Sequence, residues 1–392
     1  MLSPEGRKRF LGLLARDYGL DRQAVLDAVG PVTAAKDARG FTEAASNLRQ
    51  TLTPPRLKFL RQFSTLGEGI KFLTDLRADL VPLAKADPEF GPMDSELRDL
   101  LASWFDIGIL ELKRITWDSP AALLEKLIDY EAVHQIRSWT DLKNRLDSDR
   151  RCYAFFHPRM PNEPLIFLEA ALVDGMAADV QTLLDESAPR LDPRAADTAV
   201  FYSISNAQKG LVGVSFGGFL IKRVVDDLAH EFPNLKQFVT LSPIPGFMRW
   251  LKGRIEQGTD VLQPSEANEI AAAANASDAQ QVLLDWLADP DWPKYADRAD
   301  LLKSVLLRLC AHYLLEEKRG KNAWDRVEHF HLSNGARVER INWLGDLSAK
   351  GMAQSAGMMV NYRYKLDEIE ANHEAYTGEG RIAAATVVRT LI

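Results

Sequence analysis

The sequence predicts a multi-domain α and α+β protein, with an N-terminal helical bundle over residues 1–147 and a sheet domain over residues 148–392. Three observations support this prediction. Apolar residues recur every three or four positions as far as Leu146, as in amphipathic helices. After Asp149 they form short runs rich in aromatic and β-branched side chains, as in strands. Helical spacing returns between about residues 264 and 325, which we interpret as a helical insertion in the sheet domain.

The composition is that of a globular protein of two or three domains. Hydrophobic residues make up 46% of the 392 residues, which is enough for a large core and excludes a disordered tail protein. The net charge of −7 argues against a nucleic-acid partner bound through a broadly basic surface. Cys152 and Cys310 are too few for a disulfide framework, and they form no zinc-binding pattern with histidines.

The expected location is the cytoplasm. No apolar run reaches the roughly 20 residues that span a bilayer, so we expect no membrane partner. Ser3, Pro4 and Glu5 are typical of the start of a helix, which favours a helix of the mature protein over a targeting peptide. The low cysteine content fits a reducing compartment.

Apolar stripes and their breaks define the helical bundle. The stripes contain Phe10, Leu13, Leu14 and Tyr18, then Leu57, Leu60 and Phe63, then Ile70, Leu73, Leu76 and Leu80. Proline and glycine separate them at residues 30–31, 53–55, 67–69 and 87–92. Helices of this length with short links pack as antiparallel neighbours.

Several strands are expected after the bundle. Turn-forming prolines separate strands at residues 152–157 and 165–173, and a further strand is expected at 198–205. A glycine-rich loop, a helix at 219–232 and a strand at 238–241 follow. The order is therefore strand, glycine loop, helix, strand.

The glycine-rich loop is a candidate anion site. Small residues at the start of a helix let backbone N–H groups approach a phosphate, and Lys209, Lys222 and Arg223 lie nearby in the sequence. The loop lacks the patterns of a nucleotide P-loop and of a dinucleotide site, so a tight turn without a ligand is an equal alternative.

The same loop also fits a hydrolase motif. Residues 213–217 match the Gly-x-Ser-x-Gly nucleophile elbow, with Ser215 as the nucleophile. That elbow follows a buried strand directly, whereas residues 206–210 are polar and contain glycine. The hydrolase is therefore the weaker hypothesis.

Ser242 is a candidate catalytic hydroxyl. It ends a predicted strand, at the edge where open α/β sheets bind ligands, and Pro243 and Pro245 stiffen the turn behind it. A serine that only caps the chain is the alternative.

His329 and His331 are candidate proton donors. We expect strands at residues 327–332 and 337–344, joined by an Asn334-Gly335 hairpin turn, and a last helix at 347–360. On such a strand the two imidazoles point to one face, and imidazole titrates near neutral pH. A structural histidine is the alternative for each.

Ordered segments along nearly the whole chain resemble malonyl-CoA decarboxylase. They are residues 52–56, 151–158, 201–205, 241–247, 330–336, 340–343 and 361–364. The resemblance implies a helical bundle used in self-association, giving a homo-oligomer that is a dimer or a tetramer. It also implies a catalytic domain with the GNAT-like mixed sheet of acyl-CoA N-acyltransferases.

The resemblance further implies conversion of malonyl-CoA to acetyl-CoA and CO2 without a metal or another cofactor. The family's serine in the Ser-Pro-Ile-Pro-Gly-Phe motif falls on Ser242, and its histidine in the Phe-His-Leu-x-Asn-Gly-Ala motif falls on His331. Tyr364 and Asn361 are expected to assist them. The family's CoA-binding loop falls on Val212, Gly213, Val214, Ser215, Phe216, Gly217 and Gly218.

One sequence difference and two alternative functions stay open. Gly210 stands where the usual acetyltransferase loop has Gln or Arg, which leaves the phosphate contacts undefined. An acyltransferase on the same fold, or a CoA-binding scaffold without catalysis, would carry the same loop.

Overall fold

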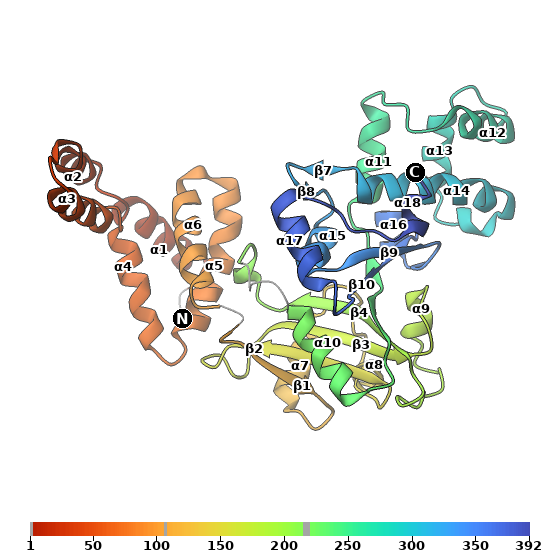
Figure 1. The fold of residues 1–392 in the computed structure, drawn as a ribbon, viewed down its shortest axis with the longest axis horizontal. Coiled ribbons are helices and arrows are strands. Elements are labelled where there is room, and N and C mark those ends of the chain that lie inside the picture. Colours follow the sequence, from red (N-terminus) through yellow and green to blue (C-terminus); the bar gives the residue numbers. More distant parts are fainter. Residues whose placement is uncertain (1–2, 106–107, 215–219) are drawn as a thin grey trace. The chain divides into compact units, whose positions relative to one another are not determined.

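The computed structural model describes residues 3–105, 108–214 and 220–392 (Figure 1). The chain forms two compact units. The first contains Met1–Glu111, Phe155–Ile166 and Asn206–Gly217, and the second contains Leu112–Ala154, Phe167–Ser205 and Gly218–Ile392. Strand β1 (Glu111–Ile115) lies beside β2 (Arg150–Phe156) in the sheet, and the domain boundary at residue 147 stays a prediction.

The first unit is mainly helical, as expected. Its helices are α1 (Pro4–Asp17), α2 (Arg22–Ala34), α3 (Ala38–Thr51), α4 (Pro55–Gln62), α5 (Gly69–Ala86) and α6 (Gly91–Ala102), with short 3-10 turns η1 (Phe63–Thr65), η2 (Pro88–Phe90) and η3 (Lys209–Leu211). The Ser3 hydroxyl accepts the Gly6 N–H at 3.1 Å and so caps α1. Leu73, Leu76 and Leu80 of α5 are buried, as their spacing predicts.

The sheet has the strand order β1-β2-β3-β4-β5-β10-β6, with β9 paired to β10. Its further strands are β3 (Pro164–Val173), β4 (Thr198–Asn206), β5 (Gln237–Thr240), β6 (Ser242–Pro243), β9 (Arg337–Asn342) and β10 (Met359–Arg363). β4 and β5 are parallel, whereas β10 runs antiparallel to β5, β6 and β9. The predicted mixed sheet and the four strands expected before Ser242 are confirmed.

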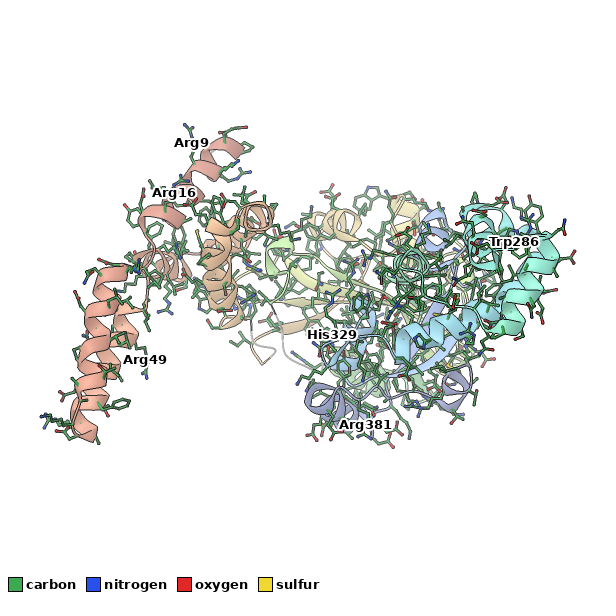
Figure 2. All side chains as sticks on the ribbon, turned by 90° about the horizontal axis from the view of Figure 1, so that it is seen from above. Arg9, Arg16, Arg49, Trp286, His329 and Arg381 are labelled. Atoms are coloured by element: carbon green, nitrogen blue, oxygen red, sulfur yellow. The ribbon has the colours of Figure 1, made fainter. Side chains whose placement is uncertain are left out.

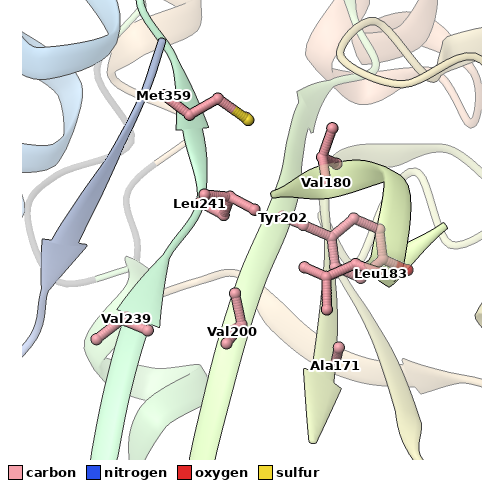
Figure 3. Close-up of a cluster of buried hydrophobic side chains, with 8 residues drawn as sticks. All are labelled: Ala171, Val180, Leu183, Val200, Tyr202, Val239, Leu241 and Met359. Atoms are coloured by element: carbon pink, nitrogen blue, oxygen red, sulfur yellow. The ribbon is translucent and has the colours of Figure 1, made fainter. Parts of the chain in front are cut away.

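Helix α10 (Leu220–Glu231) connects β4 to β5, and its apolar face is buried against the sheet (Figure 1). A further buried cluster joins α9 (Val180–Leu183) to the strands (Figure 3). It contains Ala171, Val180, Leu183, Val200, Tyr202, Val239, Leu241 and Met359. The cluster thus packs side chains of β3, β4, β5 and β10 against α9.

Residues 264–325 are largely helical, as the spacing predicts, and a further helix precedes them. The elements are α11 (Phe247–Glu256), α12 (Pro264–Ala274), α13 (Ala279–Ala288), η4 (Trp292–Lys294) and α14 (Ala296–Leu315), followed by the short strands β7 (Lys318–Arg319) and β8 (Asn322–Ala323). Trp286 of α13 is labelled in Figure 2 and is buried in this insertion. The other helices of the second unit are α7 (Ala121–Tyr130), α8 (Trp139–Arg145), α15 (Arg326–Ser333), α16 (Ala349–Ser355), α17 (Ile369–Glu379) and α18 (Thr386–Arg389).

The predicted strand at residues 327–332 is wrong, because these residues form helix α15. Asp325 caps this helix by accepting the N–H groups of Val327 and Glu328 at 2.8 and 3.3 Å. Gly335, with a φ of 83°, ends the helix instead of forming a hairpin turn. His329 and His331 are therefore neighbours on a helix and do not share a strand face.

The predicted helix at residues 347–360 is shorter than expected. α16 ends at Ser355, where Ala356 and Gly357 have φ values of 51° and 79°. Positive φ angles at two successive residues stop the helix, and β10 begins at Met359. Within the described ranges, no helix combines the length and apolar character needed to cross a membrane.

Candidate active site

Three segments bring the main candidate residues together. Ser242 lies in β6, where it pairs with Val360 of β10. His331 lies in the last turn of α15, and Tyr364 directly follows β10. All three side chains are buried, with 5% of Ser242, 2% of His331 and 1% of Tyr364 exposed.

A chain of hydrogen bonds joins these residues. The Ser242 Oγ lies 3.1 Å from His331 Nε2, and the Tyr364 hydroxyl lies 2.8 Å from His331 Nδ1. Ser242 also donates its hydroxyl hydrogen to Thr240 Oγ1 at 2.9 Å. The structure thus places a serine on one imidazole nitrogen and a tyrosine on the other.

The surroundings keep the His331 imidazole neutral. The ring stacks on Tyr362 with centroids 4.5 Å apart and an angle of 24° between the planes. Burial lowers the pKa of His331 from 6.5 to about 3, because the charged form loses its hydration. At neutral pH the ring therefore carries one proton, on one of its two nitrogens.

Tyr364 keeps its proton as well. Burial raises the pKa of the Tyr364 phenol well above 10. A neutral phenol has one O–H to donate, and His331 Nδ1 is within its reach at 2.8 Å.

Asn361 contacts the backbone around the site. Its amide nitrogen donates to the Thr240 carbonyl at 2.7 Å and to the Ala177 carbonyl at 3.2 Å. Its amide oxygen accepts from Asn342 at 2.8 Å and from Arg340 at 3.1 Å. Asn361 is thus placed to hold β5 beside β10.

Asp325 ties the histidine helix to the serine loop, a link that the sequence analysis missed. One carboxylate oxygen caps α15, and the other accepts the Gly246 N–H and the Tyr313 hydroxyl, each at 3.1 Å. A Cβ on Gly246 would lie 2.1 Å from the Tyr313 hydroxyl, so only glycine fits there. The sequence Asp325-Arg-Val-Glu328 has the spacing of a helix start, which could have revealed both the helix and its cap.

The candidate CoA loop is only partly described. Residues 215–218, including the hydrolase candidate Ser215, lie outside the described residues. Before them, Val214 is buried, Val212 is 58% exposed, and Gly213 has a φ of 75°. Arg77 of α5 donates to the carbonyls of Gly210 and Val212 at 2.7 and 2.8 Å.

Two further sequence-based candidates are placed by the structure. Lys222 forms an ion pair with Glu370 at 2.6 Å. His329 Nδ1 lies 2.7 Å from the Tyr376 hydroxyl, so its contacts differ from those of His331. Across the described part of the chain, His, Cys, Asp and Glu form no cluster of three or more that could hold a metal ion.

Both parts of the chain match one family. Residues 18–105 match the malonyl-CoA decarboxylase N-terminal domain, and residues 108–392 match the malonyl-CoA decarboxylase C-terminal domain. The chain belongs to the malonyl-CoA decarboxylase family. The resemblance of the sequence motifs is confirmed, and with it the enzyme class, a carboxy-lyase.

Relatives of the malonyl-CoA decarboxylase family match over nearly the full chain. The mitochondrial malonyl-CoA decarboxylase of Anser anser anser is 40% identical over 98% of this chain and 80% of that protein. The solved malonyl-CoA decarboxylase of Rhodopseudomonas palustris is 42% identical, covers 99% of this chain and 91% of that one, and has a TM-score of 0.90. That of Agrobacterium vitis is 40% identical, covers 100% and 92%, and has a TM-score of 0.88.

Proposed function

We propose that this member of the family converts malonyl-CoA to acetyl-CoA and CO2 at Ser242 and His331. The observation that supports this site best is the buried chain in which Tyr364, His331 and Ser242 are joined by contacts of 2.8 and 3.1 Å. It supplies a proton donor and a hydroxyl in a dry setting. The serine and histidine are those of the two family motifs.

The decarboxylation consists of one bond cleavage and one protonation. The bond between the malonyl carboxylate and the α-carbon breaks, CO2 leaves, and the electron pair moves to the thioester oxygen as an enolate. The α-carbon then takes up one proton to give acetyl-CoA. Donors aimed at the enolate oxygen and at the α-carbon are what such a reaction requires.

The charge of the site suits this sequence of steps. His331 is neutral in the free protein, with a pKa lowered to about 3. A bound malonyl carboxylate would favour the imidazolium, since a nearby negative charge raises the pKa of a histidine. We propose that His331 donates the proton to the α-carbon, and that the Ser242 hydroxyl, which donates to Thr240 in the free protein, turns to hydrogen-bond this carboxylate when the substrate binds.

The decisive experiment is a product analysis with malonyl-CoA as the sole substrate. We expect equal amounts of CO2 and acetyl-CoA. General acid catalysis contributes about 10² to 10⁴ in rate, so His331→Asn should lower kcat at least about 100-fold. Free malonate and CoA would indicate a hydrolase, and an intact thioester would indicate an acyltransferase or a scaffold. Near-normal turnover of His331→Asn would reject the histidine assignment.

We further propose that residues 212–218 bind the CoA phosphates. The support is the placement of the start of this loop, where Arg77 holds the carbonyls of Gly210 and Val212. The N–H groups of Val212 and Val214 donate to the carbonyls of Lys209 and Leu211, so among the described residues of the loop we propose the Gly213 N–H as the donor to the anion. Binding of CoA should therefore weaken when Gly213 is replaced by Val, since its φ of 75° disfavours any side chain.

We also propose that the helical unit mediates self-association. Its helices expose large apolar side chains, among them Leu13, Leu26, Phe41, Phe59 and Phe72. Helix α3, which carries Arg49 in Figure 2, has no buried residue. Exposed apolar side chains of this kind are typical of an interface between chains. Light scattering on wild type and Phe41→Glu tests this, and distinguishes dimer from tetramer.

We propose a cytoplasmic location as well. Both cysteines are free and buried, as suits a reducing compartment. Cell fractionation tests the location directly.

A further inference from the structure

Thr240 lies at the end of β5 in the buried centre of the site. Its side chain is fully buried, with 0% exposed. Its Oγ1 accepts the Ser242 hydroxyl at 2.9 Å and the Tyr362 backbone N–H at 3.0 Å. Both acceptor positions of the Thr240 hydroxyl are therefore in use.

These contacts determine where the protons lie. Ser242 has one O–H, and it points to Thr240. The 3.1 Å contact between Ser242 and His331 must then be donated by Nε2–H of the imidazole. A neutral imidazole has only one N–H, so Nδ1 is bare and accepts the Tyr364 O–H at 2.8 Å. The three hydrogen bonds thus run in one direction: Tyr364 donates to His331, His331 donates to Ser242, and Ser242 donates to Thr240.

We propose that Thr240 is a positioning residue that holds His331 in the Nε2–H tautomer by accepting the Ser242 hydroxyl hydrogen. The inference rests on the proposed role of Ser242 and His331. A serine that attacks as a nucleophile must give its proton to a bare Nε2. Thr240 favours the reverse arrangement, in which the imidazole donates toward Ser242 and the substrate.

Two matched substitutions separate the hydroxyl from the packing. Thr240→Val keeps the shape but removes the acceptor, whereas Thr240→Ser keeps the acceptor but removes the methyl group. Loss of one buried hydrogen bond should lower kcat of Thr240→Val about 10-fold, while Thr240→Ser stays within about 3-fold of wild type. Thr198→Val is the control, since Thr198 is also fully buried at the parallel β4–β5 pair but its hydroxyl donates to Asp197.

A second readout does not depend on turnover. The second readout is the 15N NMR spectrum of protein labelled with 15N-histidine. The signals of His331 are those that are absent from the spectrum of the His331→Asn variant. We expect Nε2 to be the protonated nitrogen in wild type and Thr240→Ser, and this pattern to be lost or mixed in Thr240→Val. The three spectra are recorded at neutral pH, where the ring is uncharged.

A double-mutant comparison tests whether Thr240 acts through Ser242. In a Ser242→Ala background, Thr240→Val should cause no further loss of kcat. A further 10-fold loss, equal losses in Thr240→Val and Thr240→Ser, or an unchanged tautomer in Thr240→Val would overturn the proposal. If wild type releases no CO2 while the tautomer still depends on Thr240, the proposed function fails and the role of Thr240 stands.

Discussion

The imidazole Nε2 of His331 lies 3.1 Å from the Oγ of Ser242, although 89 positions separate the two residues in the sequence. The pairing of β6 with β10 places Ser242, and the position of α15 places His331. A short contact between such distant residues depends on the links between the segments that carry them. Asp325 provides one link, because it binds both the start of α15 and the loop after Ser242.

We predict that Asp325→Asn lowers kcat about 10-fold. The amide keeps one oxygen for the helix cap but presents N–H groups to the Gly246 N–H, so the tie to the serine loop is lost. Asp278→Asn is the matched control, since Asp278 caps α13 by the same pair of contacts, to Gln280 and Gln281. Steady-state kinetics of both variants check this. Equal kcat values in both variants would contradict a role for the second Asp325 oxygen.

Arg77→Lys should raise KM for malonyl-CoA several-fold and change kcat little. A lysine cannot hold the Asp94 carboxylate and two carbonyls of the candidate CoA loop at once, as Arg77 does. The control is Arg56→Lys, because Arg56 binds Glu96 and two carbonyls of α1 by the same type of contact. A KM that rises equally in both variants would show a general loss of stability instead.

Acid should destabilise the protein partly through His331. Its pKa is lowered from 6.5 to about 3, so between these values the unfolded chain binds a proton that the folded chain does not. This contribution to the free energy of unfolding is complete above pH 6.5 and is lost as the pH falls toward 3, at up to about 1.4 kcal/mol per pH unit. His134, with a pKa lowered to about 4, adds to the same window.

Urea unfolding at pH 7.5 and pH 5 measures this effect. The decrease in the free energy of unfolding between the two values should be smaller in His331→Asn than in wild type. An identical decrease would mean that His331 titrates normally in the folded protein.

Cys152 and Cys310 should be unreactive in the native protein. Their side chains are 1% and 0% exposed, and burial raises the pKa of both thiols well above 9. A thiol reagent such as Ellman's reagent should modify them over hours under native conditions and within minutes in guanidinium chloride. Rapid modification of either thiol in the native protein would contradict the buried placement.

Apolar periodicity predicted the strands β2 to β5 correctly, but it wrongly predicted a strand where helix α15 lies. The strands at β2, β3 and β4 are continuous apolar runs bounded by turns, so length and composition were sufficient. Residues 329–332 alternate polar and apolar side chains as a strand would, but Val327 and Phe330 are three positions apart, and Asp325 caps a helix here. The two capping hydrogen bonds of Asp325 mark the start of this helix, which is only about two turns long.

By itself, the sequence determined the family, the serine and histidine motifs, and the strands β2, β3, β4 and β5 before Ser242. These features depend on residues that are close together in the chain, and on short motifs that can each be compared with those of a known family. The tertiary structure alone decided the contacts of Thr240, Asp325 and Arg77, and the neutral state of His331. Hydrogen-bond partners and desolvation come from residues that folding brings together, so no local pattern of the sequence records them.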